Sequence, residues 1–299
     1  MKTSLIFHSI RILLSVVFIF SGISKLLSVD NFELYIFSQH LFGFDVSGII
    51  ARVIISAEIS IGLLLLFNFY FNIISKLTLY ILLFFSLFLA YKLIVSANEN
   101  CNCFGDIIVF NAGESLLKNF ILILMILFIR KKPLLQKPLP QWLFVFILGV
   151  SFSTPFIYSP PDIIYRKLYP NSHPFNAEHI QLSDTTLSVD EGKKVVAFFS
   201  MGCKYCLLAA HKISIIADNT QTHENIYYVF FGEEKNMEGF WEKSQSKHFP
   251  YAIIPFEEVY EITGGYMPSV FFLENGYIKQ RTGYRDLTEN NFTDFFKPH

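Results

Sequence analysis

The sequence has little charge. Asp, Glu, Lys and Arg make up 16% of its 299 residues, whereas they make up about 25% of a typical soluble domain. Apolar residues make up 52%, and the mean hydropathy is +0.41. This balance argues against a purely soluble enzyme. The formal net charge of −1 also gives no electrostatic basis for binding nucleic acid, so we expect no nucleic-acid partner.

Charge is scarcest in the first half of the chain. Residues 1–160 hold 7 acidic and 11 basic side chains, whereas residues 161–299 hold 18 and 13. The second part therefore has the charge density of a soluble domain, and the first does not. A chain of this length has room for two ordinary domains. We predict a membrane domain followed by a soluble one.

Five apolar runs are long enough to cross a membrane as helices, which takes about 17–25 residues. They cover residues 5–27, 47–69, 73–95, 114–130 and 141–158. The first run is too long for the apolar core of a signal peptide, contains Arg11 and Lys25, and lacks a small-residue cleavage site. We interpret it as a retained helix, and the lipid bilayer is an expected partner.

Basic residues predict the orientation of these helices. The densest basic cluster lies between the fourth and fifth runs and contains Arg130, Lys131, Lys132 and Lys137. The positive-inside rule places this cluster in the cytoplasm. Alternation of the helices then places the 96–113 loop and the C-terminal domain on the outer face.

The four cysteines form two close pairs, Cys101/Cys103 and Cys203/Cys206. The predicted topology places both pairs outside the cytoplasm, where disulfides can persist. A bridge between residues two apart is possible but strained, and strained disulfides are easily reduced. Redox exchange is our main hypothesis for Cys101/Cys103, with a structural bridge, an inert thiol pair or a metal site as alternatives. No His lies in the 96–113 loop to complete a zinc site, and we predict no metal.

Two short motifs and one glutamate follow one another along the first half of the chain. They are SGISKL at 21–26, Glu58 within the second run, and CNCFGD at 101–106. Together they resemble the DoxX/MauE group of four-helix membrane proteins. The resemblance implies a small bundle linked to disulfide or quinone redox chemistry. MauE, the methylamine-utilisation member, is associated with maturation of a disulfide-rich periplasmic enzyme subunit. The fifth run is then an added helix that tethers the second domain.

Ionisable residues within membrane helices are costly and mark functional candidates. Glu58 lies near the middle of the second run, Arg11 lies in the first, and Lys25 and Arg52 lie nearer the outer face. A structural polar contact within the bundle is one interpretation, and a proton or quinone role for Glu58 is another. Quinone is the only cofactor that we consider. The sequence does not decide the roles of Glu58, Arg11 and Lys25.

The second half contains a C-x-x-C motif at a predicted junction of strand and helix. Residues 162–175, which follow the fifth apolar run, look like an irregular connector. The buried-strand run KKVVAFFS at 193–200 leads into MGCKYC at 201–206, and helical periodicity then continues to about Asp218. Such a placement is typical of thioredoxin redox sites. Backbone N–H groups and the dipole at a helix N-terminus stabilise a thiolate. We therefore predict that Cys203 is the attacking sulfur and that Cys206 resolves the mixed disulfide.

Met267-Pro268 precedes a further strand, SVFFL, and cis peptide bonds are essentially confined to X–Pro. The order of strand, C-x-x-C, helix, strand, Met-Pro, strand, hairpin and final helix resembles the thioredoxin fold. The resemblance implies that cis Pro268 faces the active site and that the preceding peptide binds a partner chain. The sequence departs from the thioredoxin pattern at two positions: Gly202 replaces the usual aromatic residue before the first cysteine, and Ala197 replaces the buried carboxylate six residues before it. These departures leave the direction of electron flow open.

The predicted fold is an α-helical membrane bundle followed by an α/β thioredoxin-like domain. The bundle covers 1–135, the fifth helix and linker cover 136–178, and the extracytoplasmic domain covers 179–299. We predict a multi-pass protein of the bacterial inner (plasma) membrane with this domain on the periplasmic side. Its predicted function is thiol–disulfide oxidoreduction between client proteins, the CxxC site and the CxC site. The alternative is a MauE-like assembly factor without general redox activity. The client, the binding of quinone and the oligomeric state stay open.

Overall fold

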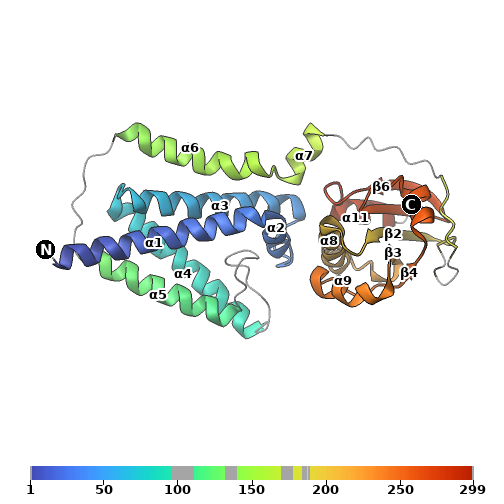
Figure 1. Ribbon diagram of the computed structural model, residues 1–299, viewed down its shortest axis with the longest axis horizontal. Coiled ribbons are helices and arrows are strands. Elements are labelled where there is room, and N and C mark those ends of the chain that lie inside the picture. The colour runs from blue at the N-terminus through green and yellow to red at the C-terminus, as the bar shows by residue number, and fades with distance from the viewer. Residues whose placement is uncertain are drawn as a thin grey trace. The chain divides into compact units, whose positions relative to one another are not determined.

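The computed structural model contains two compact units (Figure 1). It describes residues 2–95, 111–131, 140–169, 178–183, 187 and 189–297. The first unit comprises Met1–Ile36 and Gly48–Pro161, and the second comprises Phe37–Ser47 and Asp162–His299.

The first unit is built from long apolar helices. They are α1 (Lys2–Leu27), α3 (Phe44–Leu66), α4 (Phe71–Val95), α5 (Ala112–Arg130) and α6 (Gln141–Tyr158). All five are long and apolar enough to cross a membrane, as predicted, and the chain is a multi-pass membrane protein. A shorter helix, α2 (Val29–Phe37), follows α1 in the stretch between the first two apolar runs. Asp30 in its first turn favours this helix because a negative charge there complements the helix dipole.

Close packing of α1 against α3 depends on two glycines. A Cβ atom at Gly22 would lie 2.6 Å from Cγ1 of Ile59, and one at Gly62 would lie 2.6 Å from Cγ1 of Ile19. Small residues let membrane helices approach closely, since lipid supplies no hydrophobic drive for their association. Gly22 belongs to the SGISKL motif, so this packing gives the motif a structural role.

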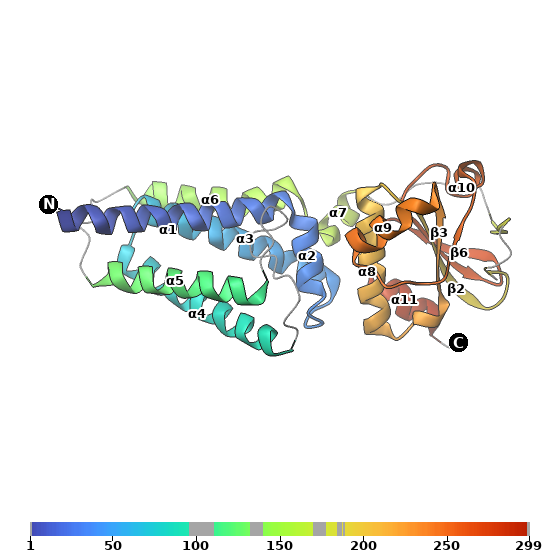
Figure 2. The same cartoon turned by 60° about the horizontal axis from the view of Figure 1, so that its bottom comes forward.

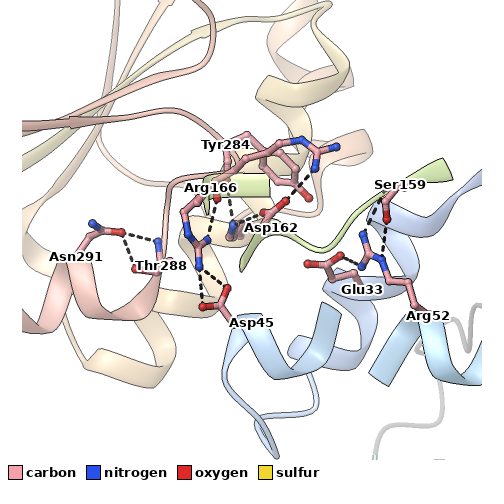
Figure 3. Close-up of polar contacts among 11 residues, drawn as sticks. Glu33, Asp45, Arg52, Ser159, Asp162, Arg166, Tyr284, Thr288 and Asn291 are labelled. Atoms are coloured by element: carbon pink, nitrogen blue, oxygen red, sulfur yellow. Dashed lines mark hydrogen bonds and ion pairs between the residues drawn. The ribbon is translucent and has the colours of Figure 1, made fainter. Parts of the chain in front are cut away.

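A buried polar cluster joins three helices of this unit. The guanidinium of Arg52 on α3 is 1% exposed and pairs with the carboxylate of Glu33 on α2 (Figure 3). Its Nε atom donates a hydrogen bond of 3.1 Å to the carbonyl of Ser159, just after α6. Satisfying a buried charge with several partners makes its burial tolerable. The cluster therefore connects α2, α3 and the end of α6.

The second unit contains a five-stranded sheet in the order β4-β3-β2-β5-β6. The strands are β2 (Lys193–Ser200), β3 (Ile226–Phe231), β4 (Tyr251–Ile253), β5 (Ser269–Glu274) and β6 (Tyr277–Thr282). The β2–β3 and β3–β4 pairs are parallel, and the β2–β5 and β5–β6 pairs are antiparallel. This mixed sheet confirms the predicted thioredoxin-like fold.

Helices cover both faces of the sheet (Figure 2). They are α8 (Lys204–Thr220), α9 (Met237–Ser244), α10 (Phe256–Thr263) and α11 (Glu289–Phe296), with two 3₁₀ turns, η1 (His223–Asn225) and η2 (Glu234–Asn236). Val259 and Ile262 of α10 pack with Phe198 on one face, whereas Phe199 meets Phe240 of α9 on the other. The five central residues of β2 are fully buried because β2 lies inside the sheet with both faces covered.

Two segments outside the sheet complete this unit. Helix α7 (Asp162–Leu168) lies where we expected an irregular connector. An acidic residue in its first turn and basic residues in its last turn favour this helix, because both complement the helix dipole. The Phe37–Ser47 segment packs on the same unit through Asp45, whose carboxylate accepts two hydrogen bonds of 2.6 and 2.7 Å from Arg166 (Figure 3).

Candidate redox site

The CxxC motif begins α8 directly after β2. Cys203 is the N-cap of α8, and its sulfur accepts a hydrogen bond from the backbone N–H of Cys206, with an N···S distance of 3.4 Å. Cys206 is fully buried one turn along, and its sulfur accepts from the N–H of Ser200 at 3.5 Å. Cys203 remains partly exposed. The N-terminal cysteine is therefore the one that a partner sulfur can reach.

The two thiols differ sharply in acidity. A hydrogen bond from the Cys206 thiol is the main cause that lowers the pKa of Cys203 to about 6; partial burial opposes it, and backbone N–H groups of Cys206 and Tyr205 assist it. The hydrogen bond to Cys203, followed by burial and by the nearby Cys203 charge, raises the pKa of Cys206. At neutral pH, Cys203 is therefore mostly a thiolate and Cys206 a thiol.

The Met267-Pro268 peptide bond is cis, as the sequence predicted. Arg281 on β6 holds this loop by donating to the carbonyl of Thr263 and to the hydroxyl of Ser269, both at 2.8 Å. Ser269 in turn donates to the carbonyl of Tyr266 at 2.6 Å. The loop before β5 is thus anchored by side chains on both of its flanks.

Ala197 and Gly202, the two departures from the thioredoxin pattern, leave the site without a buried carboxylate and without a side chain just before Cys203. Ala197 is fully buried in β2, and its partners across the sheet are Tyr228 and Val270. None of these three positions supplies a carboxylate to take a proton from Cys206. A Cβ atom at Gly202 would meet no atom within 4 Å, so the space beside Cys203 is open.

A buried cation on α8 is a feature that sequence reasoning missed. Lys212 is fully buried, lies 3.4 Å from the carboxylate of Asp162, and donates to the carbonyl of Tyr284 at 3.0 Å. Its ammonium also lies 3.3 Å from the centre of the Phe44 ring. Tyr284 contacts the ring of Tyr205 in the CxxC motif, with ring centres 5.8 Å apart. The Lys212 cluster therefore helps to position the redox-site helix.

Lys25 and Arg11, two further ionisable residues of the bundle, lie in different places. Lys25 donates to both carboxylate oxygens of Glu58 at 2.7 Å and to the hydroxyl of Ser21 at 2.8 Å. Arg11 instead donates to the carbonyls of Leu65 and Leu66 at 2.7 and 2.9 Å, at the C-terminal end of α3. Arg11 thus serves a structural role, since it satisfies carbonyls that the helix end leaves free.

The Lys25–Glu58 pair lines a pocket of about 710 Å³, open solvent at its mouth included. The wall of this pocket also contains Asn119 of α5, which the sequence did not single out as a candidate. Cys101 and Cys103 lie outside the described residues. Within the described ranges, no three His, Cys, Asp or Glu side chains converge to hold a metal ion.

Comparison with known proteins identifies the membrane domain. Residues 3–130 match the family model of the methylamine utilisation protein MauE. The MauE-like match covers the first four long helices and confirms the resemblance of that region. The chain is also 24% identical to protein TlpB of Flavobacterium psychrophilum, over 97% of this chain and 94% of that protein.

Three solved structures are each similar to this chain over 36% of its length. The thioredoxin domain of a thiol-disulfide oxidoreductase from Bacteroides vulgatus is 16% identical, with a TM-score of 0.31 over 82% of its length. A secreted Mycobacterium tuberculosis disulfide oxidoreductase is 12% identical, with a TM-score of 0.29 over 81%. StoA of Bacillus subtilis is 17% identical, with a TM-score of 0.29 over 84%.

Proposed function

We propose that this MauE-like chain is a membrane-bound thiol–disulfide oxidoreductase that acts on extracytoplasmic client proteins through Cys203 and Cys206. The observation that carries the proposal is the asymmetry of these thiols. The pKa of the partly exposed Cys203 is lowered to about 6, whereas that of the buried Cys206 is raised. An attacking sulfur needs to be a thiolate and accessible, and a resolving sulfur needs to stay protonated until the mixed disulfide has formed.

Exchange then takes two steps. The Cys203 thiolate attacks one sulfur of a client disulfide, forms a mixed disulfide and releases the other client sulfur as a thiolate. Cys206 loses its proton and attacks the Cys203 sulfur, which releases the second client sulfur and leaves a Cys203–Cys206 disulfide. The client gains two electrons and, once its sulfurs are protonated, two protons. The reverse sequence oxidises a client dithiol.

Variants of the two cysteines test this assignment. Cys206→Ala removes the resolving thiol, so the full chain should accumulate a mixed disulfide with a client or with a model disulfide peptide. Cys203→Ala should form no such adduct, and the double variant is the matched control. Adducts of equal amount in both single variants, detected by non-reducing electrophoresis, would contradict the assigned roles.

We further propose that Cys203/Cys206 exchanges electrons with Cys101/Cys103 on the outer face of the membrane. The positive-inside rule and the presence of both pairs in one chain support this relay, because tethering raises effective concentration to the millimolar range for short flexible linkers. The double variant Cys103→Ser/Cys206→Ser leaves Cys101 and Cys203 to trap an intramolecular disulfide. Failure of this variant and of the Cys101→Ser/Cys206→Ser variant to cross-link would exclude a direct relay.

An assembly factor for a disulfide-containing periplasmic protein is the second candidate, favoured by the MauE match over residues 3–130. A factor of this kind needs no activity on generic substrates. Reduction or oxidation of an unrelated disulfide protein by the purified full chain would favour the oxidoreductase. Activity confined to one client would favour the assembly factor.

A further inference from the structure

An exposed aromatic surface lies beside the redox site. Phe256 and Tyr260 of α10 are 51% and 55% exposed, and Tyr266, in the loop before Pro268, is 45% exposed. The rings of Phe256 and Tyr260 have centres 5.9 Å apart, and the Phe256 ring lies 5.1 Å from that of the half-buried Phe231. These four rings are called the aromatic surface below. Contiguous exposed apolar groups of this kind mark interaction sites.

The register of the sheet brings one end of the aromatic surface to the CxxC motif. Ser200 pairs with Phe231 in the parallel β2–β3 ladder, so the residues that follow these two also lie side by side. A Cβ atom at Gly232 would lie 3.9 Å from the sulfur of Met201. Met201 is two residues before Cys203, so the end of β3 borders the attacking sulfur's loop.

The other end of the aromatic surface reaches the cis-proline loop. A Cβ atom at Gly265 would lie 2.9 Å from Cε2 of Tyr260, so the backbone of this loop passes close beside the ring. Tyr266 follows directly, two residues before Pro268. The surface therefore extends along α10 between the two loops that flank the redox site, and a client that reacts with Cys203 would lie against it.

Negative charge borders the aromatic surface. Glu257 and Glu261 are exposed and each lies one residue after an aromatic residue of α10, so the two carboxylates form a second row along the same helix. Within the part of the chain that the structure describes, no lysine or arginine forms an ion pair with either carboxylate. Like charges four residues apart on a helix repel each other, and a cationic partner would remove this repulsion.

We propose that α10 selects clients by binding a segment that carries a large apolar side chain and a lysine or arginine near the reacting cysteine. The apolar side chain packs on Phe256 and Tyr260, and the cation pairs with Glu257 and Glu261. The same carboxylates repel anionic lipid headgroups, so a client segment suits this surface better than a membrane does. The proposal rests on the proposed function and adds a substrate class to it. The thioredoxin resemblance implies only a backbone contact before Pro268.

Exchange rates of matched peptides test this surface. The reduced full chain in detergent carries Cys101→Ser and Cys103→Ser, so only the CxxC pair reacts, and it is mixed with peptides that contain one disulfide. The first peptide has Leu and two Lys beside its disulfide, the second has Leu and two Glu, and the third has Ser and two Lys. The first should react about five-fold faster than either of the others, because it alone matches both the charges and the rings. The advantage over the Glu peptide should shrink at high salt.

Substitutions locate the source of this preference. Glu257→Gln/Glu261→Gln should reduce the preference for Lys over Glu peptides to less than about two-fold, because the paired charges are lost. Glu238→Gln/Glu242→Gln is the matched control: it removes the same charge at the same spacing from α9, on the opposite face of the sheet, and should leave the preference unchanged. Tyr260→Ser should remove the preference for the Leu peptide over the Ser peptide.

Two results would overturn the client-selecting surface. They are equal rates for the three peptides, and a preference that survives the α10 substitutions. Loss of the preference when nanodiscs of anionic lipid replace detergent would also overturn it, because lipid would then cover α10. Hydroxyethyl disulfide, a small neutral substrate, separates this proposal from the proposed function. Exchange with it without any peptide preference contradicts the surface alone. Absence of exchange with it and with every peptide contradicts the proposed function, and the surface then fails with it.

Discussion

The reactivity of Cys203 should depend on Cys206, because the hydrogen bond from the Cys206 thiol is the main cause of the lowered Cys203 pKa. With a pKa of about 6, Cys203 is about 90% thiolate at pH 7, whereas a thiol at the ordinary value of 9.0 is about 1% thiolate. A more acidic thiol gives a less nucleophilic thiolate, which reduces the rate advantage of the larger thiolate fraction about twenty-fold. Cys203 should therefore react about four-fold faster at pH 7 than an ordinary cysteine.

The assay is the rate of iodoacetamide alkylation of reduced full chain as a function of pH, read for the Cys203 peptide by mass spectrometry so that the other cysteines do not interfere. The wild-type midpoint should lie near pH 6. In Cys206→Ala the midpoint should rise toward 9, because burial, which raises the pKa of Cys203, is then opposed only by the N–H groups of residue 206 and Tyr205.

The same shift predicts how pH affects stability of the reduced protein. Because the folded pKa of Cys203 lies below the unfolded one, the thiolate stabilises the folded state fully above pH 9. This contribution is lost as pH falls through 6. A wild-type alkylation midpoint between 8 and 9, or an unchanged midpoint in Cys206→Ala, would refute the reasoning.

Three further predictions concern topology and buried charges. A membrane-impermeant maleimide should label reduced Cys203 in intact cells, and labelling only after lysis would show that the predicted topology is wrong. Lys212→Met should lower the free energy of unfolding of the second unit, measured by urea titration, by about 3 kcal/mol because it breaks a buried ion pair. Lys247 forms a half-exposed ion pair, so Lys247→Met is the control and should change the same free energy by less than about 1 kcal/mol. Glu58→Gln should lower the melting temperature of the bundle in detergent, since it leaves the charge of Lys25 buried without its carboxylate.

Several predictions from the sequence stay untested. Cys101 and Cys103 lie outside the described residues, so their redox role and the relay rest on motif and topology alone. The outer location of the second unit rests on the basic cluster after α5. These are statements about chemistry and membrane orientation, which the fold of each unit does not determine.

Local patterns were sufficient to predict most elements. The five apolar runs predicted five long helices because the length of a membrane-crossing helix depends only on bilayer thickness. The motif at 203–206 was placed correctly at the start of α8, just after β2, because a buried-strand run and helical periodicity meet there. The cis bond before Pro268 was expected from the resemblance to the thioredoxin fold, because only about 5–6% of X–Pro bonds are cis and residue type alone does not decide the isomer.

Contacts between residues far apart in sequence were decided only by tertiary structure. The partner of Lys25 is 33 residues away, and the Ser159 carbonyl bound by Arg52 is 107 residues away. The sequence showed that these charges lie in apolar helices, but not which neighbour each one faces, because that depends on the rotation and packing of the helices.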